Sequence, residues 1–137
     1  MRNKWKLWAK LDRMEIKSLE KDIYRGDIYY ANLDSNAIGS EQTGTRPVLV
    51  VQNNIGNRYS ATVIVVPLTK KSEIKLNQPT HYLLKENGNI KYDSIVLTEQ
   101  IRAIDKQRLT EKIDYLKYDI MQEIDKKLVI ALGLKNI

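Results

Sequence analysis

The chain has 137 residues, 42% hydrophobic and 29% charged, which predicts one folded domain with its own hydrophobic core. Lysine and arginine outnumber aspartate and glutamate by 23 to 17, a weak indication of an anionic partner such as nucleic acid or an acidic protein. The absence of cysteine excludes disulfides, thiolate nucleophiles and thiolate zinc sites. Because no apolar run has the length of a membrane span and no signal-peptide pattern opens the chain, we expect a cytoplasmic protein without membrane association.

The first 22 residues have the pattern of an amphipathic helix. Apolar side chains recur near helical spacing, with lysines and arginines between them: Trp5, Trp8, Leu11, Ile16 and Leu19. We expect this helical extension, residues 1–22, to pack on the domain formed by residues 23–137. A basic amphipathic helix is also able to lie on a membrane or bind a partner, and the sequence leaves those alternatives open.

The middle of the chain has the pattern of several short β-strands. The segments rich in β-branched and aromatic residues are "IYRGDIYYANL", "RPVLVVQN", "ATVIVVPLT", "HYLL" and "DSIVLTEQIRAI". Glycine and asparagine in "NIGNRYS" and "KENGN" predict turns, the first of them a hairpin turn. Many short strands with short connections predict a small β-barrel or sandwich.

The last part of the chain changes to a helical period. Apolar residues recur at steps of three or four from about Leu116: Ile120, Ile124, Leu128, Ala131 and Leu132. We therefore expect a C-terminal helix that ends near Gly133. The preceding segment "LTEKIDYL" fits a helix or a strand equally well.

Few familiar catalytic arrangements are present. His81 is the single histidine, which excludes a pair of histidines within one chain, and we expect it to be structural or on the surface. There is no Gly-rich phosphate loop, no HExxH segment and no spacing of acids that indicates a metal, so we expect neither metal nor cofactor.

Arg46 stands where a loop of small and polar residues, "GSEQTGT", meets an apolar strand. Pro47 fixes its own φ and restricts the preceding residue, so the backbone of Arg46 is held in extended geometry. A guanidinium in a defined place suits a phosphate, but composition alone favours an ion pair with Glu41 or Asp27. Thr69 ends the next buried strand, where its hydroxyl reaches the same group or caps the chain reversal.

A second group of polar residues interrupts the segment "TEQIRAI". Glu99, Gln100 and Arg102 lie on what the pattern predicts to be a strand. They would line a groove or form the solvent-exposed face of the sheet.

Taken together, these segments resemble the MazF/PemK family of toxin endoribonucleases from bacterial toxin–antitoxin pairs. The resemblance rests on "RGDIYYANL", "GSEQTGTRPVLVVQNNIGNRYSATVIVVPLT", "PTH" and "DSIVLTEQIRAIDKQRL", which occur in the order of the family's motifs, and it extends from about Tyr24 to the C-terminus. It implies an SH3-like β-barrel with a C-terminal helix, a homodimer, and cleavage of single-stranded RNA at a short sequence without a metal. It also implies a cognate, MazE-like antitoxin with an acidic disordered segment.

The same resemblance assigns roles to individual residues. Arg46 and Thr69 match the family's catalytic arginine and threonine. The residues similar to those that contact RNA or select bases are Ser40, Glu41, Gln42, Ser94, Glu99 and Gln100. Glu41 is in addition the nearest candidate for a general base, although a glutamate in a polar loop is also a natural partner of Arg46.

This chain departs from the family pattern in three places, one of which is the segment "KSEIKLNQPT", which is slightly longer than usual. Residues 1–22 precede the point at which the family usually begins, and the loop "DSNAIGSEQTGTRP" is a residue longer than usual and lacks a proline. Two other functions stay open: a toxin of the same fold that inhibits a protein target such as gyrase, and a non-catalytic barrel that binds nucleic acid. The intact Arg46 and Thr69 argue against the first of these alternatives.

Overall fold

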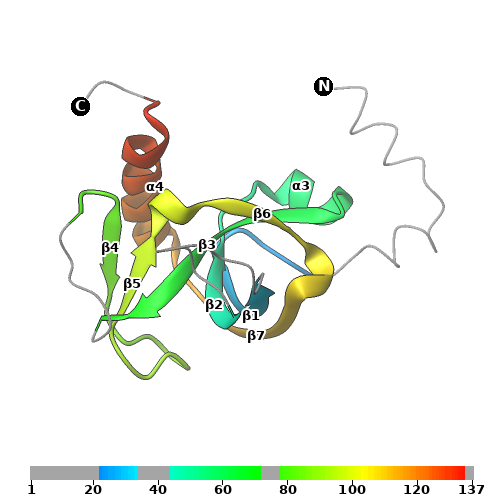
Figure 1. The fold of residues 1–137 in the computed structure, drawn as a ribbon, viewed down its shortest axis with the longest axis horizontal. Coiled ribbons are helices and arrows are strands. Elements are labelled where there is room, and N and C mark those ends of the chain that lie inside the picture. The colour runs from blue at the N-terminus through cyan, green and yellow to red at the C-terminus, as the bar shows by residue number, and fades with distance from the viewer. Residues whose placement is uncertain (1–21, 34–43, 72–77, 135–137) are drawn as a thin grey trace.

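The computed structural model describes residues 22–33, 44–71 and 78–134, so the expected N-terminal helix lies outside the described residues. Strands predominate in the described part of the chain, and a long helix closes it (Figure 1). The elements in chain order are β1 (Asp27–Leu33), β2 (Gly44–Val50), α3 (Asn54–Tyr59), β3 (Thr62–Lys70), β4 (His81–Leu84), β5 (Ser94–Leu97), the 3₁₀ turn η2 (Thr98–Gln100), β6 (Arg102–Asp105), the 3₁₀ turn η3 (Lys106–Arg108), β7 (Leu109–Tyr115) and α4 (Tyr118–Leu132).

The strands form one antiparallel sheet in the order β4-β5-β3-β2-β1-β7, with β6 also paired to β3. The prediction of a mainly β domain with a C-terminal helix is confirmed. The sheet is open, however, because β4 and β7 end the path of paired strands and no described strand joins them. The ambiguous segment "LTEKIDYL" is mostly strand, as β7.

Consecutive residues of β2 (48–50) and of β3 (65–69) are buried, so this part of the sheet is covered on both faces. Alternate residues of β1, β2 and β3 contribute to two different clusters of buried side chains. Leu49 and Val66 belong to the cluster that also contains the buried face of α4. Their neighbours Val48 and Val65 belong to the cluster on the other side, with Ile104.

Helix α4 lies beside β4 and β5, on the opposite side of the molecule from α3 (Figure 1). It buries Met121, Ile124 and Leu128, at the three- and four-residue steps of an amphipathic helix. Gly133 ends it with φ +65°, the left-handed conformation typical of a helix C-terminus. The predicted C-terminal helix is therefore confirmed, with its first residue at Tyr118.

Arg25 connects the start of β1 to α4 and to the end of β2. Its Nε donates a hydrogen bond to the carbonyl of Val51 at 2.9 Å, and its guanidinium contacts the carboxylate of Asp125 at 2.5 Å. Its backbone N–H donates to the side-chain oxygen of Asn54 at 2.7 Å. One residue thus ties together three parts of the chain that are far apart in sequence.

The hairpin turn predicted in "NIGNRYS" is wrong, because residues 54–59 form helix α3. The side chain of Asn53 caps this helix by accepting the backbone N–H of Gly56 at 2.8 Å. Asn57 is fully buried, and its side-chain amide donates to the carbonyl of Gln52 at 2.9 Å. β2 and β3 pair as a hairpin would pair them, but the connection is a capped helical turn.

The single strand predicted for "DSIVLTEQIRAI" is also wrong, because η2 divides it into β5 and β6. Both pieces pair with the same edge of β3, but in different registers: Leu68 lies opposite Val96, and Val65 lies opposite Arg102. Between these two pairs β3 advances by three residues, whereas the segment that contains β5 and β6 advances by six. The three additional residues form η2.

Candidate functional site

Arg46 and Thr69 lie on neighbouring antiparallel strands, each two residues beyond the last residue pair of β2 with β3. In the pairing of β2 with β3, Val50 is opposite Val65, Leu49 opposite Val66, and Val48 opposite Pro67. Two residues beyond the last of these pairs, β2 reaches Arg46 and β3 reaches Thr69. Continued by two residues, this register would set Arg46 opposite Thr69, which is 23 positions away in the sequence.

Both residues also belong to the same face of the sheet. Successive side chains of a strand point to opposite faces, so every second residue shares a face. Arg46 is two residues from Val48 on β2, and Thr69 is four residues from Val65 on β3, so each shares a face with that valine. Both valines belong to the same buried cluster. Thr69 is buried, with 4% of its surface exposed, and Arg46 is partly buried. A partly buried guanidinium beside a buried hydroxyl is a combination that suits a phosphate.

Asp27 is not the partner of Arg46. β1 places Ala31 opposite Arg46, and Asp27 lies four positions further along, roughly 13 Å away at the usual rise of a strand. The buried carboxylate of Asp27 instead accepts the backbone N–H of Tyr24 at 2.9 Å and lies 3.2 Å from the ammonium of Lys112. The interpretation of Arg46 as an ion-pair partner of Asp27 is therefore wrong.

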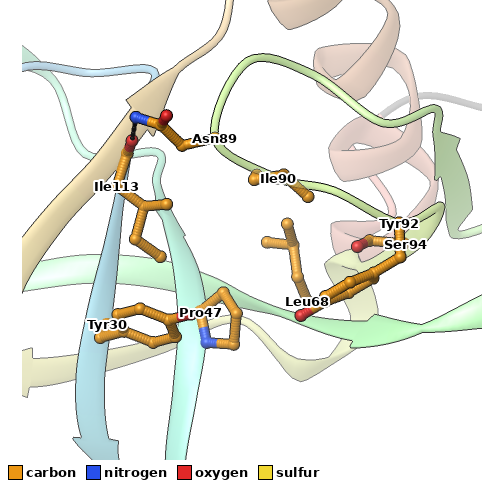
Figure 2. Close-up of a pocket in the computed structure, with 8 residues that line it drawn as sticks. All are labelled: Tyr30, Pro47, Leu68, Asn89, Ile90, Tyr92, Ser94 and Ile113. Carbon is orange, nitrogen blue, oxygen red and sulfur yellow. Dashed lines mark hydrogen bonds between the residues drawn. The ribbon is translucent and has the colours of Figure 1, made fainter.

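Ser94 lies at the same end of the sheet as the two catalytic candidates. It pairs across the sheet with Lys70, the residue after Thr69, and only 2% of its surface is exposed. Its side chain lines a cavity of about 30 Å³ (Figure 2). Figure 2 shows Tyr30 and Pro47 on one side of this cavity, Tyr92 and Ser94 on the other, and Leu68 between them.

Glu99 is held in place by two hydrogen bonds, one to each oxygen of its carboxylate. The hydroxyl of Thr80 donates to one oxygen at 2.9 Å, and Nε2 of His81 lies 3.1 Å from the other. The hydroxyl of Thr98 in turn donates to the backbone carbonyl of Thr80 at 2.5 Å, which ties the turn before β4 to η2. His81 is buried, so the expectation that it is structural agrees with its place beneath this carboxylate.

The structure separates the predicted RNA contacts into two groups. Ser94 lies beside the strand ends that carry Arg46 and Thr69, whereas Glu99 and Gln100 belong to η2 at the other end of β5. Ser40, Glu41 and Gln42 lie outside the described residues. Among the residues that the structure describes, no three histidine, aspartate or glutamate side chains are grouped as metal ligands would be.

Sequence reasoning overlooked two residues next to this site. Lys70 and Tyr92 come together where β3 ends and just before β5 begins, with the ammonium of Lys70 4.7 Å from the centre of the Tyr92 ring. Neither residue stands in a motif, and the only signal was the position of Lys70 directly after Thr69. None of the helices in the described ranges is long and apolar enough to cross a membrane.

The fold is that of MazF proteins. A crystal structure of MazF from Deinococcus radiodurans superimposes with a TM-score of 0.68 at 23% identity, covering 83% of this chain and 99% of that one. An endoribonuclease from a mycobacterial species, solved in complex with its cognate antitoxin, also gives a TM-score of 0.68, at 26% identity, covering 84% of this chain and 99% of that one.

The sequence comparisons agree with the fold. Residues 24–132 match the PemK-like, MazF-like toxins of type II toxin-antitoxin systems. The endoribonuclease EndoA of Bacillus subtilis strain 168 is 49% identical over 113 residues, which cover 82% of this chain and 96% of that protein. This chain therefore belongs to the PemK/MazF-like toxin family, as its motifs predict.

Proposed function

We propose that this protein is an endoribonuclease toxin that cleaves single-stranded RNA at a short sequence. The observation that carries the proposal is the pairing of β2 with β3, whose register, continued by two residues, would set Arg46 opposite Thr69 on one face of the sheet. The family and the 49% identical endoribonuclease support the same activity.

RNA supplies its own nucleophile, which explains why so few protein groups are needed. The 2′-oxygen attacks the adjacent phosphorus, the bond from phosphorus to the 5′-oxygen breaks, and the products are a 2′,3′-cyclic phosphate and a 5′-hydroxyl. Arg46 stabilises the charge that develops on the phosphorane oxygens, and Thr69 donates a hydrogen bond to them. One preorganised donor of this type is worth about 10²–10³ in rate.

Two protons move in this reaction. The 2′-hydroxyl loses one, and the leaving 5′-oxygen gains one. Glu41 is our candidate for the base that accepts the first of these protons.

The bases of the RNA would be read on their edges, as is usual for unstacked single strands. We assign base contacts to Glu99 and Gln100 on η2, and further RNA contacts to Ser40, Gln42 and Ser94. The orientation of Glu99 supports its assignment, since a carboxylate held by two donors keeps lone pairs for the N–H groups of a base.

We further propose a cytoplasmic homodimer that is inhibited by an antitoxin with an acidic, disordered segment. The net charge of +6 favours such a partner, and a solved relative is described as bound to its cognate antitoxin. Residues 23–137 would form the toxin domain, and residues 1–22 a helical extension.

The test is incubation of the purified protein with a long unstructured RNA in the presence of a chelator, beside Arg46→Ala and Thr69→Ala variants. We expect cuts at one short sequence, cyclic phosphate and 5′-hydroxyl ends, and a loss of rate of about 10² or more in each variant. Salt-sensitive RNA binding without products would instead identify a non-catalytic barrel. Neither binding nor cleavage by folded wild-type protein would direct attention to a protein target such as gyrase.

A further inference from the structure

A lysine that directly follows Thr69 in the chain lies over an aromatic ring. Lys70 follows Thr69 at the end of β3, and its ammonium is 4.7 Å from the centre of the Tyr92 ring. Tyr92 stands two residues before Ser94, which pairs with Lys70 across the sheet. Lys70 is exposed, and 37% of the surface of Tyr92 is exposed as well.

The Tyr92 ring reaches toward both strands that carry the catalytic candidates. It forms one wall of the cavity described above, whose lining includes Pro47 and Leu68 (Figure 2). Pro47 follows Arg46, and Leu68 precedes Thr69. Side chains alternate along a strand, so Pro47 and Leu68 face the side of the sheet opposite Arg46 and Thr69. RNA whose phosphate is held by Arg46 and Thr69 would reach the exposed part of the ring by passing over the end of β3, where Lys70 follows Thr69.

The chemistry of the pair fits a nucleotide better than it fits a structural role. An exposed contact between a cation and an aromatic ring stabilises a fold only weakly. A flat ring beside a positive charge is, in contrast, the combination with which proteins hold single-stranded nucleic acid: the ring stacks on a base, and the cation contacts the backbone.

We propose that Tyr92 and Lys70 form a nucleotide-binding subsite that flanks the scissile phosphodiester. The inference rests on the proposed function, because it takes RNA as the ligand. The Tyr92 ring stacks on the base of a nucleotide adjacent to the cut, and the Lys70 ammonium contacts a phosphate of the same strand. Since every base has a flat face, this subsite sets affinity and not the sequence that is cut.

The test measures binding of a short unstructured RNA in a Thr69→Ala background, where the strand stays intact. Tyr92→Leu keeps an apolar cavity wall but removes the ring, and we expect it to raise Kd about 5- to 150-fold, which corresponds to about 1–3 kcal/mol. Tyr92→Phe and Tyr92→Trp keep a ring and should stay within about twofold of the parent or bind more tightly. Lys70→Met keeps the aliphatic stem, and the slope of log Kd against log salt concentration should fall by about 0.7.

The outcomes separate this subsite from the proposed activity. If wild-type protein does not cleave RNA, the proposed function fails first. If wild-type protein cleaves while Tyr92→Leu binds RNA like its parent, only the subsite is overturned. Three other results would overturn the subsite as well. They are an equal loss of RNA affinity in Tyr92→Leu and Tyr92→Phe, an unchanged salt slope in Lys70→Met, and variants that lose binding of the antitoxin but not of RNA. Thermal unfolding of each variant shows whether a loss of binding reflects a loss of fold.

Discussion

His81→Phe should weaken RNA binding without changing the rate of the chemical step, because it releases the carboxylate that we assign to base recognition. Nε2 of His81 lies 3.1 Å from one oxygen of Glu99, and the hydroxyl of Thr80 donates to the other at 2.9 Å. Nδ1 of His81 is buried and has no hydrogen-bond partner among the described residues. We therefore assign an N–H to Nε2, since an N–H at Nδ1 would be a buried donor without an acceptor.

The expected magnitudes follow from the exposure of the two partners. A hydrogen bond to a charged group is worth about 1.5–3 kcal/mol, but 31% of the Glu99 side chain is exposed, so water replaces part of what is lost. The phenyl ring fills the space of the imidazole and removes the unpartnered Nδ1. We expect a loss of about 1 kcal/mol in stability, which lowers Tm by roughly 2–6 °C.

The effect on RNA binding comes from the freed side chain. A Glu99 side chain that is no longer oriented must be immobilised again when RNA binds, at a cost of about 0.5–1.5 kcal/mol. This predicts a rise in Kd of about 2- to 12-fold. Cleavage should also spread to sequences that differ at the base read by Glu99.

The assay is fluorescence anisotropy with a short RNA, together with mapping of the cut sequences. Thr80→Val is the matched variant, because it removes the hydrogen bond on the other oxygen and should act in the same direction. In a Glu99→Ala background, His81→Phe should have no further effect on Kd. An undiminished effect in that background, or an unchanged Kd in both single variants, would refute the positioning role.

Two further predictions concern stability. Arg25→Met removes the ion pair with α4 and a hydrogen bond to the end of β2, and should lower the free energy of unfolding in urea by about 1–2 kcal/mol. Asp125→Asn removes only the ion pair and should lower it by less than about 1 kcal/mol, because this ion pair is partly exposed. An equal loss in both variants would mean that the hydrogen bond contributes nothing. Burial, and to a smaller extent nearby carboxylates, raise the pKa of Tyr29 and of Tyr82 above 10.0. The folded protein therefore binds these two protons more tightly than the unfolded chain does. We expect the free energy of unfolding to fall as the pH rises above about 10. Tyr29→Phe and Tyr82→Phe should each make that fall less steep in urea titrations at several pH values, and a slope unchanged in both would contradict the assignment.

The sequence alone determined those elements whose pattern of apolar residues shows which of their faces are buried. The continuous apolar runs of β2 and β3 predict strands buried on both faces, and the recurring apolar residues before Gly133 predict α4. The turn in "KENGN" is confirmed by the bridge between Asn87 and Ile90. The order of the motifs was sufficient to identify the family, because it combines several segments that are uninformative one at a time.

The tertiary structure decided what depends on partners far away in the chain. A cap at Asn53 and the buried amide of Asn57 turned an expected hairpin turn into α3, and the two registers along β3 divided one expected strand into β5 and β6. The register of β2 with β3, continued by two residues, would set Arg46 opposite Thr69, and the register of β3 with β5 places Lys70 near Tyr92. Local periodicity cannot contain this information, since a register is set by how whole strands pack against each other and against the core.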